Sequence, residues 1–215
     1  MGYLPQIDMV KIIQLQVGGF DNNFSYIVIG EKKHSKDVLL IDPTGERSII
    51  ENKIKEMDLK VVLQALTHNH PDHCELVDYF KLKGVQTLLP SSKKLGEFEE
   101  KDVCGFRARF IHTPGHTSDC VCIQIENNLF TGDTLFARGA GNTQYGGNDK
   151  EQEETIAFLS QLDQNLIIWP GHNYGGEKCT LGEALKNANI MPSKKVLDLI
   201  AGKVKEYNAK AKRKL

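Results

Sequence analysis

Hydrophobic and polar positions in the first third of the chain alternate with the period of short β-strands. Ile13, Leu15 and Val17 alternate with polar neighbours, and residues 24–29 and 38–41 are two further runs rich in β-forming side chains. Glycines and short polar residues separate these runs, which is typical of turns between strands. The pattern predicts three consecutive strands at the start of the chain.

A change of period marks the first helix. Residues 46–57 place their apolar side chains three and four positions apart, on one helical face. Residues 61–66 form a mainly apolar run, which is typical of a strand that is buried on both faces. A second helix is expected over residues 72–83, ended by Gly84.

The second half of the chain repeats this order of strands and helices. Strands are predicted at residues 106–110, 121–125, 128–131 and 166–169. A helix begins after Asn148, which forms a capping-box pattern with Glu151, and extends to about Leu162. The last helix is expected at about residues 193–210, capped by Ser193. These elements predict one domain, residues 1–215, with helices packed outside central sheets.

The composition narrows the function classes. The 215 residues include 40% hydrophobic and 26% charged residues, which is the balance of an ordinary globular domain. The formal net charge of −1 leaves no basic excess of the kind that nucleic acid binding requires. The expected partner is therefore a small-molecule substrate and not a nucleic acid. The oligomeric state stays open.

The sequence shows no feature of export or membrane insertion. Residues 1–19 mix charged and polar residues among the apolar ones, so they lack the hydrophobic core of a signal peptide. No uncharged apolar run is long enough to span a membrane. The five cysteines have none of the spacings of a zinc ribbon or a C-x-x-C redox pair. We interpret the protein as cytoplasmic, with free thiols and no membrane partner.

The placement of histidine carries the most information. Five of the seven histidines lie in three short segments, residues 67–73, 113–117 and 169–174, each beside a predicted strand end. Imidazole and carboxylate are suitable ligands for zinc and for iron. A single histidine is usually a core or surface residue, but the run T-H-N-H-P-D-H with two later Gly-His turns and one Gly-Asp turn is too specific for that. The candidate metal ligands are His68, His70, Asp72, His73, His116, Asp133 and His172.

The run H-x-H-x-D-H is the hallmark of the metallo-β-lactamase superfamily, which this chain resembles from residues 21–24 through 39–43 to 169–174. The resemblance implies an α/β (α+β) fold, an αββα sandwich with two divalent metal ions at one edge of its sheets. It assigns His68, His70 and His116 to the first ion, and Asp72, His73 and His172 to the second, with Asp133 between them. Zinc is the expected metal, and iron or manganese also fit.

Two further segments bear on the branch of this superfamily. Residues 131–136 resemble glyoxalase II, which hydrolyses glutathione thioesters, and Tyr174 matches a glutathione-binding tyrosine of that branch. Tyr174 fits equally well as an ordinary aromatic residue at the rim of the site. Residues 138–145 are similar to a segment of persulfide dioxygenases, which makes Arg138 and Tyr145 candidates for substrate binding. Asn142 stands where that segment has arginine.

The resemblance implies a metal-dependent thioesterase of glyoxalase II type that uses a metal-bridging hydroxide. Asp72 and Asp133 are the catalytic candidates, because they hold the ions and orient the nucleophile. The substrate is then a small thioester, with glutathione thioesters included. The alternatives are an iron-dependent persulfide dioxygenase and a lactonase or β-lactamase-type hydrolase on the same fold. A purely structural metal site is disfavoured, because such sites are closed and rich in cysteine.

Overall fold

The computed structural model describes residues 10–19, 21–30, 36–189 and 192–212. The first strands of the chain pair into one mixed sheet in the order β1-β2-β3-β4-β5. Its members are β1 (Lys11–Gly18), β2 (Asn23–Ile29), β3 (Asp37–Ile41), β4 (Lys60–Ala65) and β5 (Gln86–Leu88). The strands β1 to β3 are antiparallel to one another, and β3, β4 and β5 are parallel. The three strands predicted at the start of the chain are confirmed.

The second half of the chain forms a second sheet in the order β11-β10-β9-β8-β7-β6. Its members are β6 (Phe98–Val103), β7 (Phe106–His112), β8 (Val121–Ile125), β9 (Asn128–Gly132), β10 (Ile167–Pro170) and β11 (Cys179–Thr180). The pair β9 and β10 is parallel, and the other neighbours are antiparallel. The four strands predicted in this half are therefore present.

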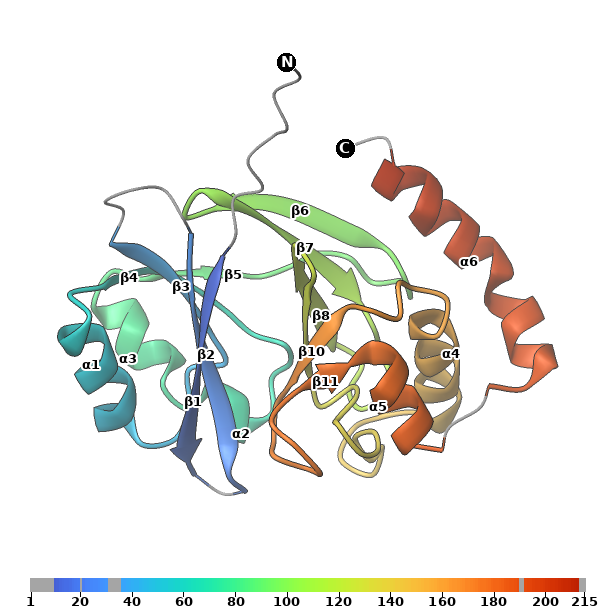
Figure 1. Cartoon of the computed structure of the whole chain (residues 1–215), viewed down its shortest axis with the longest axis horizontal. Coiled ribbons are helices and arrows are strands. Elements are labelled where there is room, and N and C mark those ends of the chain that lie inside the picture. Colours follow the sequence, from blue (N-terminus) through green and yellow to red (C-terminus); the bar gives the residue numbers. More distant parts are fainter. Residues whose placement is uncertain (1–9, 20, 31–35, 190–191, 213–215) are drawn as a thin grey trace, which may run out of the picture.

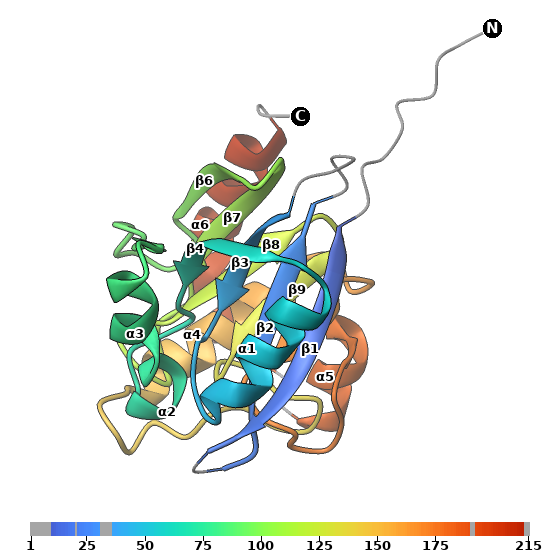
Figure 2. The same ribbon diagram turned by 90° about the vertical axis from the view of Figure 1, so that its left-hand side faces the viewer.

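Helices cover the outer face of each sheet, as Figures 1 and 2 show. The first three helices are α1 (Arg47–Glu56), α2 (Pro71–Cys74) and α3 (Val77–Leu82), and the last three are α4 (Asp149–Leu159), α5 (Leu181–Asn187) and α6 (Lys194–Lys212). In Figure 1, α1 and α3 lie outside the first sheet, whereas α4, α5 and α6 lie outside the second. The result is the four-layer αββα sandwich that the resemblance implied.

The core has three layers, one between the sheets and one beneath each set of helices. Between the sheets, the Tyr26 ring meets the rings of Phe130 and Trp169 with centroid distances of 5.1 and 5.9 Å. Ile50 and Phe80 pack on the outer face of the first sheet. Because both faces of β2 are covered, its residues are buried with hardly any alternation. Packing on both faces fixes the strand ends from which the candidate ligands project.

The predicted helix over residues 72–83 is wrong in one respect, since it is two helices, α2 and α3. The backbone N–H of Leu76 donates to the carbonyl oxygen of Pro43 at 2.9 Å and not to a carbonyl one turn earlier. This contact joins the chain to the loop after β3 and ends α2. Asp72 and His73 therefore lie on a helix of one turn, which is placed by its neighbours in the fold.

Two other predictions need correction. The strand at residues 61–66 is not buried on both faces along its whole length, because β5 pairs only with Leu63 to Ala65 and leaves the first half of β4 partly exposed. The helix after Asn148 ends at Leu159 and not at Leu162, because the following residues form tight three-residue turns. The oxygen of the Asn148 side chain does accept from the backbone N–H of Glu151 at 3.0 Å, as the capping pattern predicted.

The pattern missed four elements: β5, β6, β11 and α5. The strands β5 and β11 have three and two residues, which is too short for a recognisable period. The strand β6 carries four charged residues, and its Glu100 is held by Arg109 of β7 at 2.8 Å. A signal for α5 was present, because Thr180 and Glu183 form a reciprocal capping box at its start.

The C-terminal helix agrees closely with its prediction. Its expected range, about residues 193–210, becomes Lys194–Lys212 in the structure. The Ser193 hydroxyl accepts from the backbone N–H of Val196 at 3.4 Å, and Ile200 and Tyr207 are buried against the second sheet. Among the helices described, none combines the length and the apolar character needed to cross a membrane. Residues 1–9, part of the segment in which no signal peptide was found, lie outside the described residues.

Candidate metal centre

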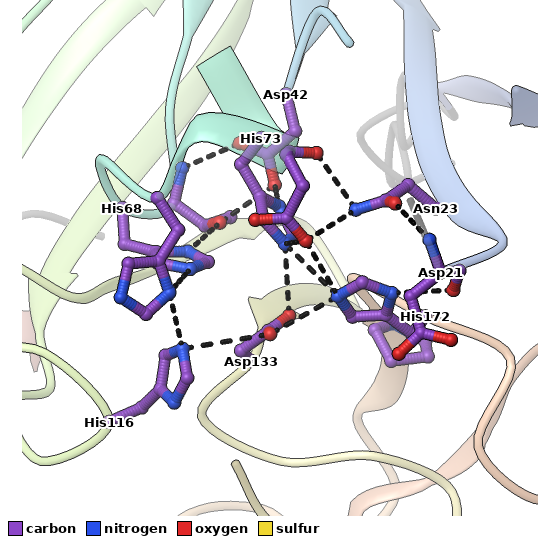
Figure 3. Close-up of polar contacts among 12 residues, drawn as sticks. Asp21, Asn23, Asp42, His68, His73, His116, Asp133 and His172 are labelled. Atoms are coloured by element: carbon purple, nitrogen blue, oxygen red, sulfur yellow. Dashed lines mark hydrogen bonds and ion pairs between the residues drawn. The ribbon is translucent and has the colours of Figure 1, made fainter. Parts of the chain in front are cut away.

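The predicted metal ligands lie on loops and on α2, at the same end of the two sheets. His68 and His70 follow β4, and His116, Asp133 and His172 come after β7, β9 and β10, respectively. In Figure 1, α2 lies at the lower end of the sheets. Figure 3 shows the labelled side chains of this region directed toward one another. Sheet pairing therefore assembles side chains that are far apart in the chain.

Three groups of these side chains each have their ligand atoms within 4.8 Å of one another. The groups are His68, His70 and His116; His68, His73 and Asp133; and Asp72, His73 and His172. Together they contain all seven residues that the sequence predicted as ligands. The first and third groups contain the same residues as the two predicted ion sites. Their role as metal ligands stays a prediction.

All five imidazoles of the centre are anchored through one ring nitrogen to an oxygen atom. A neutral imidazole has one N–H and one lone pair, so an acceptor at one nitrogen leaves the lone pair on the other. The pairs are His68 Nδ1 with Thr67 Oγ1 (3.2 Å), His70 Nε2 with the Tyr145 carbonyl (3.0 Å), His73 Nδ1 with Asp42 Oδ2 (3.1 Å), His116 Nδ1 with the Asn142 carbonyl (2.6 Å) and His172 Nδ1 with the Asp21 carbonyl (2.9 Å). The second ring nitrogen of each histidine faces the centre, in the orientation typical of metal-binding histidines.

These inward nitrogens lie close together. His116 Nε2 is 2.9 Å from His70 Nδ1, and His73 Nε2 is 3.3 Å from His172 Nε2. Two lone pairs at such distances repel each other unless a proton or a cation lies near both. The donor set therefore fits divalent metal ions of the kind that imidazole and carboxylate bind.

Asp133 lies between the two groups of histidines. Its Oδ2 atom is 3.2 Å from His172 Nε2 and 3.6 Å from His116 Nε2, while its Oδ1 atom is 3.2 Å from His73 Nε2. Although Oδ1 is within ion-pair distance of His73, its contact does not have the geometry of a hydrogen bond, and the atom is buried without a hydrogen-bond partner. A buried carboxylate oxygen in this state fits a neighbouring cation.

The pKa shifts show how the centre balances charge through protons. Burial and the neighbouring His73 lower the pKa of His68 well below its usual value. Burial also acts to lower the pKa of His73, but Asp133 and Asp42 outweigh it and raise that pKa well above its usual value. Although burial favours the neutral acid, His73 and His172 hold the pKa of Asp133 well below its usual range. A metal ion that binds His73 must therefore displace a proton from it, whereas His68 is already neutral.

Three polar residues that hold the ligands were not singled out from the sequence. Asp42 binds both His73 and the Thr67 hydroxyl, the latter at 2.7 Å. The Asn23 amide donates to the carbonyl and to Oδ2 of Asp72 at 2.8 and 3.1 Å. The third residue is Asp21, the anchor of His172. These side chains lie in segments that carried the family resemblance, but their function depends on contacts that only the fold creates.

The centre lies at the wall of a cavity of about 780 Å³. Its lining residues are Asp21, Thr44, His70, Pro71, Asp72, Cys74, Glu75, His116, Asp133, Asn142, Tyr145, His172 and Tyr174. The Tyr174 ring stacks on His172 with a centroid distance of 5.2 Å, and its hydroxyl donates to the Asp21 carboxylate. Tyr145 is 71% exposed, and its backbone carbonyl anchors His70. Both tyrosines therefore line the cavity, and their contact with a substrate stays a prediction.

Arg138, the third candidate for substrate binding, lies outside this wall. It is exposed, and its side-chain carbons pack against the backbone of Gly175, so that a side chain at Gly175 would approach them to 2.5 Å. The backbone N–H of Arg138 donates to the Tyr174 carbonyl at 3.0 Å. In the structure Arg138 therefore packs against the loop that carries Tyr174 and Gly175. Its contact with a substrate stays a prediction.

An αββα sandwich with converging imidazoles and carboxylates at the edge of its sheets is typical of metallo-hydrolases. The sequence profile described as the Metallo-beta-lactamase superfamily matches residues 18–111 and 94–172. These matches cover more than half of the chain, which therefore belongs to the metallo-β-lactamase superfamily.

The chain is similar to several named hydrolases. It is 28% identical over 168 residues to the "Probable polyketide biosynthesis zinc-dependent hydrolase PksB" of Bacillus subtilis, covering 71% of this chain and 74% of that protein. It is also 28% identical over 208 residues to a hydroxyacylglutathione hydrolase of Pelagibacter ubique, covering 90% and 82%, respectively. These identities are modest, so they leave the substrate open.

Solved structures share the fold at lower identity. The structure of ETHE1 from Myxococcus xanthus superimposes with a TM-score of 0.73 at 21% identity, covering 88% of this chain and 89% of that one. The structure of TTHA1623 in a di-iron-bound form superimposes with a TM-score of 0.63, also at 21% identity, covering 83% and 100%. These likenesses show the fold alone.

We expect the protein to hold about two zinc ions per chain after it is supplied with zinc and dialysed. The reason is that the first and third groups of ligand atoms, which match the two predicted ion sites, lie side by side. Elemental analysis should show about one ion in His68→Ala and in His172→Ala, since each removes a ligand from a different group. His112→Asn is the matched control, because His112 is a buried histidine outside all three groups. The prediction is contradicted if both alanine variants bind as much metal as the wild type, or if the wild type binds no metal.

Proposed function

We propose that this protein is a metal-dependent thioesterase of the glyoxalase II type, with zinc as its metal. The observation that carries the proposal is the convergence of five anchored imidazoles and two carboxylates at the wall of an open cavity. A catalytic metal site keeps a position open for water or substrate, whereas a structural site is closed. Five of the predicted ligands line the cavity, so a substrate can reach them.

The ions, when bound, lower the pKa of a water molecule towards neutrality and polarise the substrate carbonyl. Asp133 would offset the positive charge of both positions, because its Oδ1 faces His73 of the third group and its Oδ2 faces His116 of the first. Asp72 is held by the Asn23 amide, so its carboxylate keeps one orientation toward the second position. These residues hold and orient the reacting groups without forming a covalent bond to the substrate.

No cysteine nucleophile is needed for this chemistry. Cys74 lines the cavity, but burial raises the pKa of its thiol, which keeps it protonated and weakly nucleophilic at neutral pH. Its Sγ lies 3.8 Å from the Asn69 carbonyl, as in a packed thiol.

The relatives support a thioester as the substrate class. Several that the chain resembles are named hydroxyacylglutathione hydrolase, among them one from Shewanella halifaxensis at 28% identity over 165 residues. Tyr174 lies beside His172 at the cavity, where the glyoxalase II resemblance places a substrate-binding tyrosine. The resemblance of residues 138–145 to persulfide dioxygenases supports the alternative, iron-dependent oxidation of a persulfide.

One protein preparation can separate these two activities. We expect zinc- or manganese-loaded protein to release thiol from acyl thioesters such as S-lactoylglutathione in the absence of oxygen. Zinc has no redox chemistry, so it cannot support a dioxygenase. A thiol-release assay and an oxygen electrode measure both reactions. Iron-dependent oxygen uptake with glutathione persulfide, combined with no thiol release for any metal, would overturn the proposal.

A further inference from the structure

The charge of the cavity wall is one-sided. Beyond the predicted ligands, its ionisable residues include two carboxylates, Asp21 and Glu75. Among the described residues that line the cavity there is no lysine and no arginine. Away from the metal positions, a substrate that carries carboxylates therefore meets negative charge along the wall and finds no basic side chain there.

The two carboxylates differ in their surroundings. Asp21 is held in place, because its carboxylate accepts from the Tyr174 hydroxyl and its backbone carbonyl accepts from His172. Glu75 follows α2 and is exposed, and its side chain makes no hydrogen bond or ion pair with another described residue. The charge of Glu75 is therefore not offset by a neighbour and acts on whatever enters the cavity.

Two basic residues close in sequence to the cavity lining are directed elsewhere. The Lys178 ammonium lies 4.6 Å from the centre of the Trp169 ring. The carbons of the Arg138 side chain pack against Gly175. Neither residue belongs to the cavity wall.

We propose that this cavity selects thioesters whose thiol half is uncharged, and that it discriminates against glutathione thioesters. This inference rests on the proposed thioesterase function and names its substrate class. Glutathione carries two carboxylates and one ammonium group, so it has a net negative charge at neutral pH. Away from the metal positions, a carboxylate that leaves water for this cavity loses hydration, finds no basic side chain with which to pair and is repelled by Glu75. An uncharged thiol avoids these costs and can pack against Pro71, Tyr145 and Tyr174.

The test compares two esters with the same acyl group, S-lactoyl-N-acetylcysteamine and S-lactoylglutathione. We expect wild-type kcat/KM to favour the uncharged ester by about tenfold or more. Glu75→Lys should raise the ratio of kcat/KM for the glutathione ester to kcat/KM for the uncharged ester by about tenfold, chiefly through a lower KM for the glutathione ester. The gain should shrink at high salt, because Glu75 is exposed.

Glu153→Lys is the matched control. Glu153 is an exposed carboxylate on α4, outside the cavity wall and without a described partner, so the same charge change there should alter neither ester. Equal or better use of the glutathione ester by the wild type, or an ester preference that Glu75→Lys does not change, overturns the inference.

A binding measurement separates failure of the inference from failure of the proposed function. S-methylglutathione and S-methyl-N-acetylcysteamine are thioethers that cannot be hydrolysed, and calorimetry gives their affinities for the metal-loaded protein. We expect tighter binding of the uncharged thioether, with Glu75→Lys improving only S-methylglutathione. If neither ester is cleaved but this binding order holds, the thioesterase assignment fails and the selectivity stands. If S-methylglutathione binds more tightly to the wild type, the selectivity itself is wrong.

Discussion

Asp133→Asn is expected to lower kcat by at least about a thousandfold, which corresponds to about 4 kcal/mol of transition-state stabilisation. The physical reason is that Asp133 lies between the two groups of histidines, with Oδ1 toward His73 of one group and Oδ2 within 3.6 Å of His116 Nε2 of the other. Asparagine keeps the volume but removes the charge that offsets two cations. It also directs an amide NH2 group toward atoms that face a carboxylate in the native protein, and an amide is a poor bridge between two ions.

The measurement needs a folded variant. Circular dichroism and a thermal melt should show a native fold, and elemental analysis should report the metal content beside the turnover rate. Asp78→Asn is the matched control, because the Asp78 side chain is 89% exposed on α3 and lies outside the cavity wall. Wild-type turnover by a folded, metal-loaded Asp133→Asn protein would show that Asp133 has no part in the reaction.

Gly171→Ala is expected to displace ligands of the second ion position and to lower activity by about a hundredfold or more. A Cβ atom at Gly171 would lie 2.3 Å from Asp133 Oδ1 and 2.5 Å from His73 Cε1. Both distances are shorter than any van der Waals contact, so the side chains or the loop must move. The constraint is one of space, because α2, which carries His73, and the loops that carry Asp133 and His172 meet at this residue.

Elemental analysis of Gly171→Ala should show less bound metal than the wild type. Gly202→Ala is the matched control, because Gly202 lies in α6 with no heavy atom within 4 Å of a Cβ placed there. That variant should keep full activity and gain up to about 1 kcal/mol in the free energy of unfolding. Full metal content and activity in Gly171→Ala would mean that the loop accepts a methyl group without moving a ligand.

The periodicity of apolar residues in the sequence was sufficient to predict the longer helices and strands. The alternation of Ile13, Leu15 and Val17 lies in β1, and the helical spacing of Ile200 and Tyr207 lies in α6. Such patterns arise because one face of each element is buried, and the burial repeats along the segment. The charged strand β6 shows no such pattern, because its pairing with β7 depends on contacts such as Arg109 with Glu100. Short strands also escape detection, since two or three residues cannot show a period.

The candidate ligands could be identified from the sequence because their chemistry is local. The run of His68, His70, Asp72 and His73 has the right donors at close spacing, and the later Gly-His and Gly-Asp turns complete the set. The tautomers could not be predicted in the same way. They depend on acceptors such as Asp42 and the carbonyl of Asp21, whose distances from the histidines are set by sheet pairing and not by neighbours in the chain.

The sequence by itself determined the donor chemistry, the order of the main strands and helices, and the family to which the chain belongs. Only the tertiary structure decided which oxygen anchors each imidazole, why Gly171 has no room for a side chain, and which charges face the cavity. The physical reason is that periodicity and ligand type are properties of neighbouring residues. By contrast, electrostatic and steric interactions depend on distances in space, and these exist only after both sheets have packed. Glu75 illustrates the difference, since nothing in its local sequence distinguishes it from any other exposed glutamate.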